Sequence, residues 1–500
     1  MQRFLSRNGL FVLLIPIFFV LHGYAQNVGM MTVSDCLYLL ATYLVASIIL
    51  YGIAWFIFRN HLKAALLSAF LLSCYLFFGS LLDFLKAYLN FLSHYSVIVP
   101  LGLVCICVLV FYLKRTRSQL YKVSFFINIL LLIYLVVDLG GIIWKSTHQP
   151  ADKLSIYDSN LSDQFLPCDT CKNPDIYFLL FDEYSSTAAL KETFHYDNSG
   201  LDSFLLDRGF SLQSQSRSNY NFTPFSMASM LNLNYIAGLK NPGACTLQDY
   251  ANCNALIRNN EVIRFLSSRL YEIVNYSVFD LAGNPSLVES SLLPVKTRLI
   301  TAQTFFNRIN HDIGWNLKMG KYEWSWLTKD IIYGGLHNNN QFLDLLSKET
   351  RQKTGRPKFV YAHFQMPHGP FFYDRNMQLR DRKKLMAEQQ GHHIDSYLDY
   401  IPYTNQKIKE LIDTIQQNTN HSAVIILMGD HGFRVTPDGS STGHYFQNLN
   451  AVYFPEKNYR ELNDSISGVN QFRIIFNTLF RQSLPVLKDS TVFLTDQPEK

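Results

Sequence analysis

Two side chains that commonly bind metals stand next to each other in VIILMGDHGF, residues 424–433. Asp430 and His431 follow a run of apolar residues and lie between Gly429 and Gly432. A charge buried beside an imidazole is unfavourable unless it is paired or bound to a metal. We therefore predict that Asp430 and His431 are metal ligands at the end of a buried strand. The two glycines would permit the tight turn that directs both side chains inward.

Groups of the same kind accompany two other apolar runs. Asp182 and Glu183 follow DIYFLLF, and His363 and His368 lie in HFQMPHGP. Each has an ordinary explanation when taken alone, because an Asp after a strand is usually a helix cap or a turn former and a single His is usually a hydrogen-bonded core residue. Together, their oxygen and nitrogen atoms suit zinc or manganese better than a metal that prefers thiolates.

A hydroxyl group of a different kind lies in SNYNFTPFSMASMLNLNY, residues 218–235. Pro224 suits the first position of a helix, so we expect Thr223 to be the N-cap of a helix over residues 225–233. One interpretation is that the Thr223 hydroxyl only caps this helix. The other is that it stands at the positive end of the helix as a metal-activated nucleophile that attacks phosphorus or sulfur.

A further histidine, His444, lies in STGHYF, thirteen residues after His431. A loop histidine at this place can protonate a leaving group or hold an anionic oxygen. Considered alone, it would be interpreted as a solvent-exposed residue.

These groups need a sheet that brings separate strand ends together. Continuous apolar runs indicate strands buried on both faces, and helical patterns lie between them. Such alternation predicts a mostly parallel sheet with helices on both faces, in which ligands gather at the carboxyl ends of the strands. The predicted strands are 175–181, 270–278, 358–364, 423–428 and 449–454, and the predicted helices are 197–207, 260–269, 340–349 and 397–416.

The first 146 residues hold most of the long apolar runs, and five of these runs are each about long enough to cross ~30 Å of hydrocarbon as a helix. Basic residues mark the cytoplasmic side of a membrane protein, and their positions put the N-terminus inside. An odd number of spans then puts the rest of the chain outside. We predict a transmembrane domain over 1–146, a linker over 147–173 and an extracytoplasmic catalytic domain over 174–490. The predicted spans are 9–25, 36–58, 63–85, 95–113 and 123–144, and the basic residues are Arg3, Arg7, Arg59, Lys63, Lys114, Arg115, Arg117 and Lys122.

Charge and cysteine content agree with an envelope protein. The formal net charge of +5 is small for 500 residues and gives no reason to expect a nucleic-acid partner. Cys168 and Cys171 have the spacing of a redox or zinc pair, but in an oxidising compartment a local disulfide is the favoured interpretation. Cys245 and Cys253 are placed to close a second short loop.

Taken in order, these stretches resemble the alkaline phosphatase and sulfatase superfamily, and in particular its membrane-anchored lipoteichoic acid synthases and phosphoethanolamine transferases. Those families join about five N-terminal spans to an extracytoplasmic catalytic domain. The resemblance implies a multi-pass α-helical membrane domain followed by an α/β sulfatase-like domain with a mostly parallel central sheet. Its specific motifs lie between residues 175 and 454.

The resemblance also implies a role for each candidate residue. FDEYSS is similar to the first metal-carboxylate motif, NFTPFSMAS to the nucleophile segment, and GDHG to the second metal motif. HFQMPHGP is similar to the His-x4-His-Gly-Pro stretch of phosphoethanolamine transferases. The metal ligands implied are Asp182, Thr223, Asp430 and His431 with Glu183 as a second carboxylate, Thr223 is also the nucleophile, and His363, His368 and His444 lie near the substrate, the first two beside a second metal if there is one.

One departure from the family pattern bears on the reaction. Sulfatases that hydrolyse sulfate esters carry a Cys or Ser that is converted to an aldehyde, in a C/S-x-P-x-R segment, whereas here the segment is TPFSM, residues 223–227. A threonine cannot become that aldehyde. The sequence therefore favours phosphoryl chemistry through a phosphothreonine.

From these observations we expect a metal-dependent phosphotransferase in the inner membrane, with its catalytic domain in the periplasm. The donor would be a lipid-linked phosphodiester, since a soluble substrate would not need five spans, and the acceptor a hydroxyl of an envelope glycan or lipid. A sulfatase-like hydrolase of phosphodiesters or sulfate esters is one alternative. A non-catalytic membrane scaffold is the other, and the full set of ligand-type residues speaks against it.

Overall fold

The protein, described by a computed structural model, forms two units. Unit 1 consists of Met1–Ala151 and Leu292–Trp324, and unit 2 consists of Asp152–Ser291 and Ser325–Lys500. The structure describes residues 2–28, 31, 33–147, 155–156, 161–239, 244–287, 297–312, 325–388, 393–437 and 441–495.

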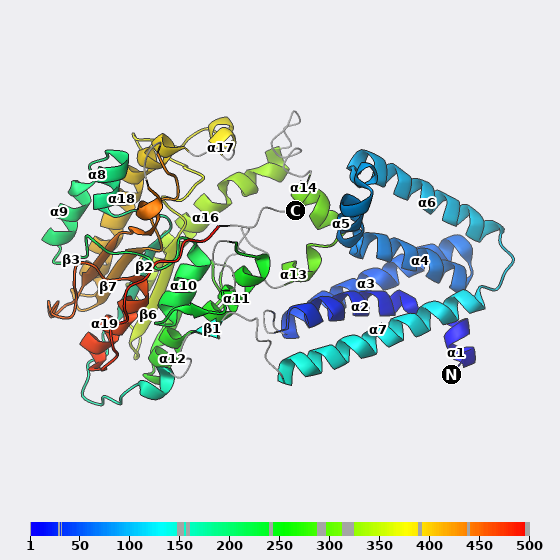
Figure 1. Ribbon diagram of the computed structural model, residues 1–500, viewed down its shortest axis with the longest axis horizontal. Coiled ribbons are helices and arrows are strands. Elements are labelled where there is room, and N and C mark those ends of the chain that lie inside the picture. The colour runs from blue at the N-terminus through cyan, green and yellow to red at the C-terminus, as the bar shows by residue number, and fades with distance from the viewer. Residues whose placement is uncertain are drawn as a thin grey trace. The chain divides into compact units, whose positions relative to one another are not determined.

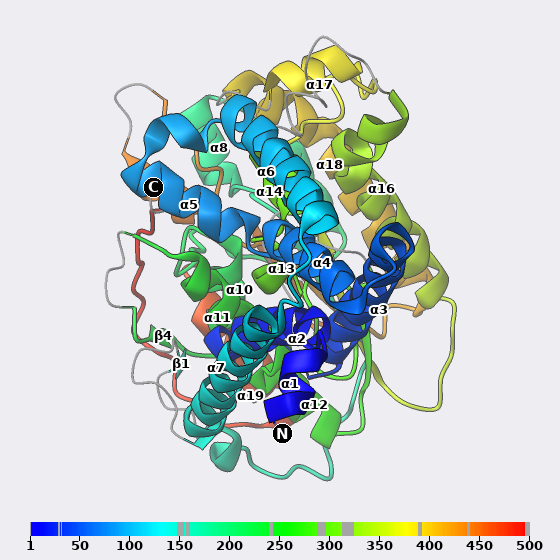
Figure 2. The same ribbon diagram turned by 90° about the vertical axis from the view of Figure 1, so that its right-hand side faces the viewer.

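Unit 1 is built from apolar helices (Figure 2). Three of them, α3, α6 and α7, are long and apolar enough to cross a membrane, which agrees with the predicted membrane domain. The N-terminal elements are α1 (Gln2–Arg7), α2 (Phe11–Gln26), α3 (Val33–Phe58), α4 (His61–Leu76), α5 (Phe78–Tyr88), η1 (Asn90–Ser93), α6 (Tyr95–Arg115) and α7 (Tyr121–Thr147).

Two of the five predicted spans differ in the structure. The helix in the first, α2, has 16 residues and is thus about 24 Å long, which is shorter than the hydrocarbon core. The third, predicted over 63–85, is broken into α4 and α5, which are bent by 64° relative to each other. By length and composition, the described helices therefore give three spans, or four if the bent pair counts as one.

A segment that the sequence assigns to the catalytic domain packs with unit 1. It contains α13 (Arg298–Thr301) and α14 (Phe305–Asp312). Ile300 is buried in the same apolar cluster as residues of α2 and α4. The Phe305 ring meets the Phe78 ring of α5 edge-on at 4.8 Å, and the Tyr95 hydroxyl donates a 2.7 Å hydrogen bond to Asp312.

Unit 2 contains the predicted sheet (Figure 1). The sheet has six strands in the order β3-β8-β7-β2-β6-β5. The four strands β7, β2, β6 and β5 are parallel, and β8 is antiparallel to β7. The prediction of a mostly parallel sheet is therefore confirmed. The strands are β2 (Ile176–Phe181), β3 (Ser211–Leu212), β5 (Glu272–Tyr276), β6 (Lys358–Phe364), β7 (Val424–Gly429) and β8 (Asn450–Tyr453), and β1 (Ser155–Ile156) pairs with β4 (Ile236–Ala237) in a separate ladder.

The strands are apolar throughout because both faces of the sheet are covered. Successive side chains of β2 point to opposite faces, so Leu179 and Phe181 join one buried cluster while Phe178 and Leu180 join the other. Helices α8 (Thr187–Phe194), α9 (Ser199–Asp207), α16 (Ser325–Glu349), α17 (Arg382–Glu388) and α18 (Ile394–Asn418) contribute to the first cluster, and α10 (Thr223–Leu231), α11 (Leu247–Arg258), α12 (Glu261–Ser268) and α19 (Gly468–Phe480) to the second; η2 (Leu161–Gln164) and η3 (Thr442–Phe446) complete the unit.

Replacement of Gly79 should loosen the segment of residues 297–312. A Cβ atom at Gly79 would lie 2.9 Å from the backbone Cα of Gln303 and closer still to two side chains, so Gly79→Val must displace the segment. We expect a loss of about 1–3 kcal/mol in the free energy of unfolding, measured by thermal denaturation in detergent. Gly102→Val is the matched control, because a Cβ at Gly102 meets nothing within 4 Å. Equal unfolding midpoints for the two variants would contradict this packing.

Candidate metal centre

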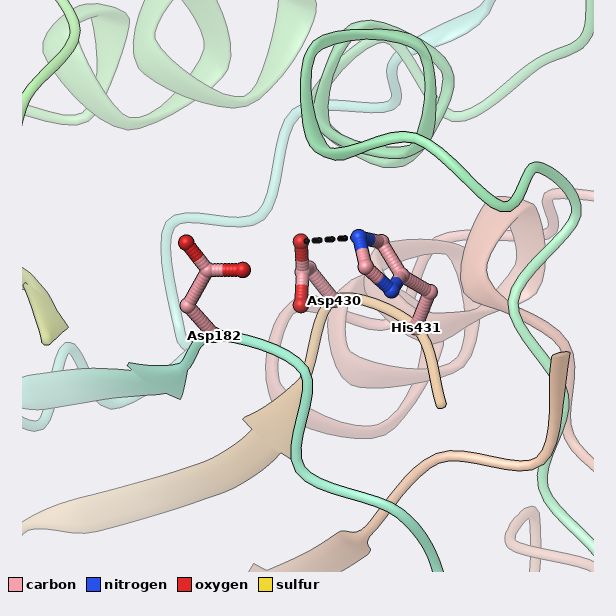
Figure 3. Close-up of side chains that lie close together, drawn as sticks. All are labelled: Asp182, Asp430 and His431. Atoms are coloured by element: carbon pink, nitrogen blue, oxygen red, sulfur yellow. Dashed lines mark ion pairs between the residues drawn. The ribbon is translucent and has the colours of Figure 1, made fainter. Parts of the chain in front are cut away.

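The register of two parallel strands brings two carboxylates together. Phe181 of β2 is paired with Gly429 of β7, so the next residues, Asp182 and Asp430, leave the same edge of the sheet side by side. Both side chains are buried, and Figure 3 shows them in a group with His431. One side-chain oxygen or nitrogen atom from each of the three residues lies within 4.8 Å of the other two, and their role as metal ligands stays a prediction.

The orientation of His431 suits metal binding. Its Nδ1 lies 2.9 Å from the carbonyl oxygen of Gly432, to which it donates a hydrogen bond. Neutral imidazole then carries a lone pair on Nε2, and this atom faces Asp430 Oδ2 at 3.2 Å. Burial lowers the pKa of His431, although Asp430 opposes the shift, so the ring stays in the neutral form that a metal requires.

The hydroxyl of Thr223 lies against this group. Thr223 Oγ1 is 3.4 Å from Asp182 Oδ1 and 3.2 Å from His431 Nε2. The prediction that Thr223 is an N-cap is wrong by one position, because α10 begins at Thr223 and Phe222 is the N-cap. The hydroxyl therefore points to the acidic cluster instead of capping its own helix, and the residue is half-buried.

The residues present fit a divalent cation. Asp430 Oδ2 is buried and has no hydrogen-bond partner among the described residues, which is unfavourable unless a ligand satisfies it. Two carboxylates, an imidazole nitrogen and a hydroxyl form a donor set typical of zinc, and manganese also accepts it.

Electrostatic repulsion between the carboxylates also favours a cation. Burial and the nearby Asp430 carboxylate raise the pKa of Asp182 to about 8. Burial would raise the pKa of Asp430 too, but His431 and His363 together lower it below its ordinary value. The site thus holds Asp430 ionised and leaves Asp182 to share either a proton or a metal.

Glu183 is turned toward a basic residue. Its carboxylate accepts a 2.7 Å hydrogen bond from Nε of Arg434 and lies 3.9 Å from Nε2 of His368. Burial would raise the pKa of Glu183, but Arg434 and His368 lower it below its ordinary value. The backbone of Glu183 has φ 58°, and its amide donates a 2.9 Å hydrogen bond to Asp430 Oδ1. A ligand role for this carboxylate stays a prediction.

Two predicted histidines face the acidic groups. His363 Nε2 lies 3.9 Å from Asp182 Oδ2 and has no hydrogen-bond partner among the described residues. Burial lowers the pKa of His363 to about 4, so the ring is neutral. For His368, burial would lower the pKa, but Asp182 and Glu183 raise it above the ordinary value. His368 is therefore the more cationic of the two and suits an anionic substrate.

His444 makes other contacts. Its Nδ1 and Nε2 lie 2.8 Å from the carbonyl oxygens of Ser441 and Val435, and its ring packs edge-on against Phe194. Both ring nitrogens thus have backbone partners, and a contact with the phosphoryl group stays a prediction.

The glycines around Asp430 and His431 serve close backbone approach. A Cβ at Gly429 would lie 2.3 Å from the carbonyl oxygen of Tyr184, and a Cβ at Gly432 would lie 2.1 Å from that of His444. Neither glycine has a positive φ, so the expectation that they permit a tight turn is not met. Glycine is needed at both positions because a side chain would not fit.

The sequence analysis missed three supporting residues. Ser226 donates a 2.7 Å hydrogen bond to the carbonyl oxygen of Asp430, and Tyr397 donates one of 2.9 Å to that of Glu183. In the sequence, Ser226 is only a weaker hydroxyl candidate than Thr223 because it lies further along the helix, and nothing marks Tyr397. Arg434 did leave a signal, since it is a basic residue three positions after His431 in DHGFR.

Residues 283–463 match the family model described as Sulfatase. The match confirms the predicted resemblance to the sulfatase superfamily over this region. It includes the candidate residues from His363 onward, whereas Asp182 and Thr223 lie before it. No curated protein matches the chain.

Three solved structures illustrate the likeness. The integral membrane protein lipooligosaccharide phosphoethanolamine transferase A from Neisseria meningitidis is 13% identical, with 94% of this chain and 95% of that chain covered and a TM-score of 0.35. The C-terminal periplasmic domain of EptC from Escherichia coli, in complex with zinc, is 11% identical, with 63% and 84% covered and a TM-score of 0.37. The phosphonate monoester hydrolase of Agrobacterium radiobacter is 12% identical, with 61% and 74% covered and a TM-score of 0.36.

Metal binding should strengthen as the pH rises toward 8. Asp182 must lose its proton to bind a cation, and its pKa of about 8 lies far above the ordinary 3.8. In the metal-free protein, the stabilising effect of this raised pKa is complete below about pH 3.8 and is lost as the pH rises through 8. We therefore expect the zinc-induced rise in melting temperature to be larger at pH 8 than at pH 6. Asp182→Asn should remove the difference, and equal shifts at the two pH values in the unmodified protein would contradict it.

Gly432→Ala should disturb the centre. The new Cβ would meet two backbone carbonyl oxygens, those of His444 at 2.1 Å and Gln447 at 2.9 Å, which cannot move freely. We expect a loss of about 1–3 kcal/mol in stability and a lower metal content by elemental analysis. In the control Gly443→Ala, the Cβ has only ordinary contact, with Ser441 Oγ at 3.6 Å. If both variants keep full metal content, this role of Gly432 is wrong.

Proposed function

We propose that this chain, whose residues 283–463 match the sulfatase family, is a membrane enzyme that transfers a phosphoryl-linked group from a lipid donor to an envelope glycan or lipid. The observation that carries the proposal is the position of the Thr223 hydroxyl, within 3.4 Å of Asp182 and 3.2 Å of His431. Asp182, Asp430 and His431, with Thr223 itself, would hold zinc or manganese. The bound cation supplies positive charge that favours the ionised form of the hydroxyl.

The reaction proceeds in two displacements. Thr223 Oγ1 attacks the phosphorus of the donor phosphodiester, an O–P bond forms, and the bond from phosphorus to the lipid oxygen breaks. The lipid leaves as an alcohol after it takes a proton, and a phosphodiester of Thr223 remains. The hydroxyl of the acceptor then attacks the same phosphorus, gives up its proton, and releases Thr223.

The histidines would assist through charge and proton transfer. His368, whose pKa is raised by Asp182 and Glu183 against the effect of burial, can donate a proton to the leaving oxygen. His363 is neutral and presents an unpartnered Nε2, so it can accept the proton of the acceptor hydroxyl or bind a second cation. Both ring nitrogens of His444 have backbone partners. A contact between His444 and the phosphoryl group would therefore require that η3 rearranges.

The membrane context supports a lipid donor. Helices α3, α6 and α7 can span a bilayer, and basic residues lie at the predicted inner ends of the spans. The Cys168–Cys171 disulfide, predicted from the sequence, is present and fits an oxidising compartment, whereas Cys245 and Cys253 are not joined by a disulfide in the described part of the chain. We propose a multi-pass inner-membrane protein with a periplasmic catalytic unit.

Replacement of Thr223 tests the nucleophile. When the metal-loaded protein is incubated with phospholipid, intact-mass spectrometry should detect an added phosphoryl-linked group that is absent in Thr223→Ala. Transfer activity should fall at least about a thousandfold in Thr223→Ala, because the attacking atom is gone. Thr223→Ser keeps the hydroxyl and should retain the adduct. An equal adduct in Thr223→Ala would exclude this nucleophile, and full cellular function in that variant would support the scaffold alternative.

A hydrolase of the same fold is the second candidate, and the sulfatase match is the observation that favours it. Water would then release the group from Thr223. Assays with a chromogenic phosphodiester and a sulfate ester, with and without added metal, distinguish the two reactions. Turnover without any acceptor would favour hydrolysis.

A further inference from the structure

Arg434 is a basic side chain at the metal centre to which the mechanism above gives no task. It lies in the loop after β7, three residues beyond His431, and only 27% of its side chain is exposed. An arginine is seldom buried without a specific partner for its charge. Its partner here is Glu183, through a single hydrogen bond from Nε.

Most of the hydrogen-bonding capacity of Arg434 is unused. A guanidinium has five N–H donors, and the bond to Glu183 takes one. None of the described residues accepts a hydrogen bond from its two terminal NH₂ groups. These groups can bind an oxyanion with two parallel hydrogen bonds, a geometry that arginine forms with phosphate.

Two contacts hold the guanidinium beside the nucleophile. Its carbon atom lies 4.8 Å from the centre of the Phe222 ring, and Phe222 immediately precedes Thr223 in the chain. On the other side, Glu183 directly follows the ligand Asp182. Arg434 therefore links the nucleophile segment to the first metal segment and is fixed in orientation by both.

The net charge of the site gives the guanidinium of Arg434 a second role. Asp182, Glu183 and Asp430 carry three negative charges when ionised, and a divalent metal neutralises two of them. Arg434 neutralises the third, so that an anionic phosphodiester can enter without net repulsion. Without Arg434, the incoming phosphate would meet one positive charge fewer in a buried site, where electrostatic energies are large.

We infer that Arg434 binds a non-bridging oxygen of the phosphoryl group that reacts with Thr223, through its terminal NH₂ groups, and that Glu183 holds it in place for this task. The inference rests on the proposed function, since it assumes that Thr223 takes up a phosphoryl group. It assigns Glu183 to the positioning of Arg434 and assigns Arg434 to the recognition of an anionic phosphoryl oxygen.

The test measures binding of inorganic phosphate to the full-length, zinc-loaded protein in detergent by isothermal calorimetry. Zinc content and melting temperature are measured on the same samples. Arg434→Gln should weaken phosphate binding by about tenfold to a hundredfold, the usual effect of a lost hydrogen bond to a charged group, at unchanged zinc content. Arg434→Lys keeps the charge without the paired donors and should bind phosphate with intermediate affinity. The control is Arg351→Gln, at an exposed arginine that is distant from Arg434 in the sequence.

The variant Glu183→Gln tests whether Arg434 binds phosphate or only neutralises the buried charge of Glu183. If Arg434 only neutralises a buried Glu183, then Glu183→Gln removes the need for it and Arg434→Gln weakens phosphate binding only by disordering Glu183. The inference instead predicts that Glu183→Gln weakens phosphate binding by only a few-fold, less than Arg434→Gln does, because the amide oxygen of Gln can still accept the hydrogen bond from Arg434 Nε but no longer holds it by charge. Equal losses in Arg434→Gln and Glu183→Gln, an unchanged affinity in Arg434→Gln, or loss of zinc together with phosphate would each overturn it.

Phosphate affinity tests the inference, and the adduct on Thr223 tests the proposed function. Phosphate binding that depends on Arg434, without any adduct on Thr223, would refute the covalent mechanism and leave Arg434 as a phosphate-binding residue. An adduct that forms normally in Arg434→Gln, with normal phosphate affinity, would refute the inference and leave the mechanism intact. If the zinc-loaded protein binds no phosphate but still forms the adduct on Thr223, the inference is refuted and the mechanism stands; if it does neither, both are refuted.

Discussion

Repulsion between two buried carboxylates is the constraint on which the catalytic unit depends. Asp182 and Asp430 are neighbours because β2 and β7 are parallel and in register, and this geometry is fixed by the core beneath them. Burial, and after it the Asp430 carboxylate, raise the pKa of Asp182 to about 8. Folding energy from the apolar strands maintains an arrangement that isolated side chains would avoid, and the site is thereby prepared for a cation.

The surrounding residues convert this strained pair into an ordered site. Hydrogen bonds that involve the backbone fix the position of Asp430. The backbone amide of Glu183 donates to the Asp430 carboxylate, and the Ser226 hydroxyl donates to the carbonyl oxygen of Asp430. Gly432 allows the loop of His444 to lie directly against the metal segment. The first two contacts join segments that are 247 and 204 residues apart in the sequence. The rigidity of the centre is therefore a property of the whole sheet edge and not of any one motif.

The sequence predicted most of unit 2, because strands buried on both faces leave continuous apolar runs. All five predicted strands are present, and each strand end differs from its prediction by no more than two residues. The proximity of Asp182, Asp430 and His431 was also predictable, since parallel strands bring their carboxyl ends to one edge. By contrast, hydropathy does not reveal the 64° bend after Leu76, and single charges such as Arg434 have no periodicity. The partners of His444 are backbone atoms, which no side-chain pattern indicates.

The segment of residues 297–312 belongs to unit 1, although the chain before and after it belongs to unit 2. It begins and ends in the sequence of the catalytic unit, yet Ile300 and Phe305 pack against helices of unit 1. A soluble fragment cut after residue 151 would retain this segment and lose the helices that bury it. Such a fragment would carry exposed apolar side chains in the middle of its chain and would tend to self-associate. Purification of the active enzyme therefore calls for the intact chain in detergent or lipid, or for a fragment in which this excursion is shortened.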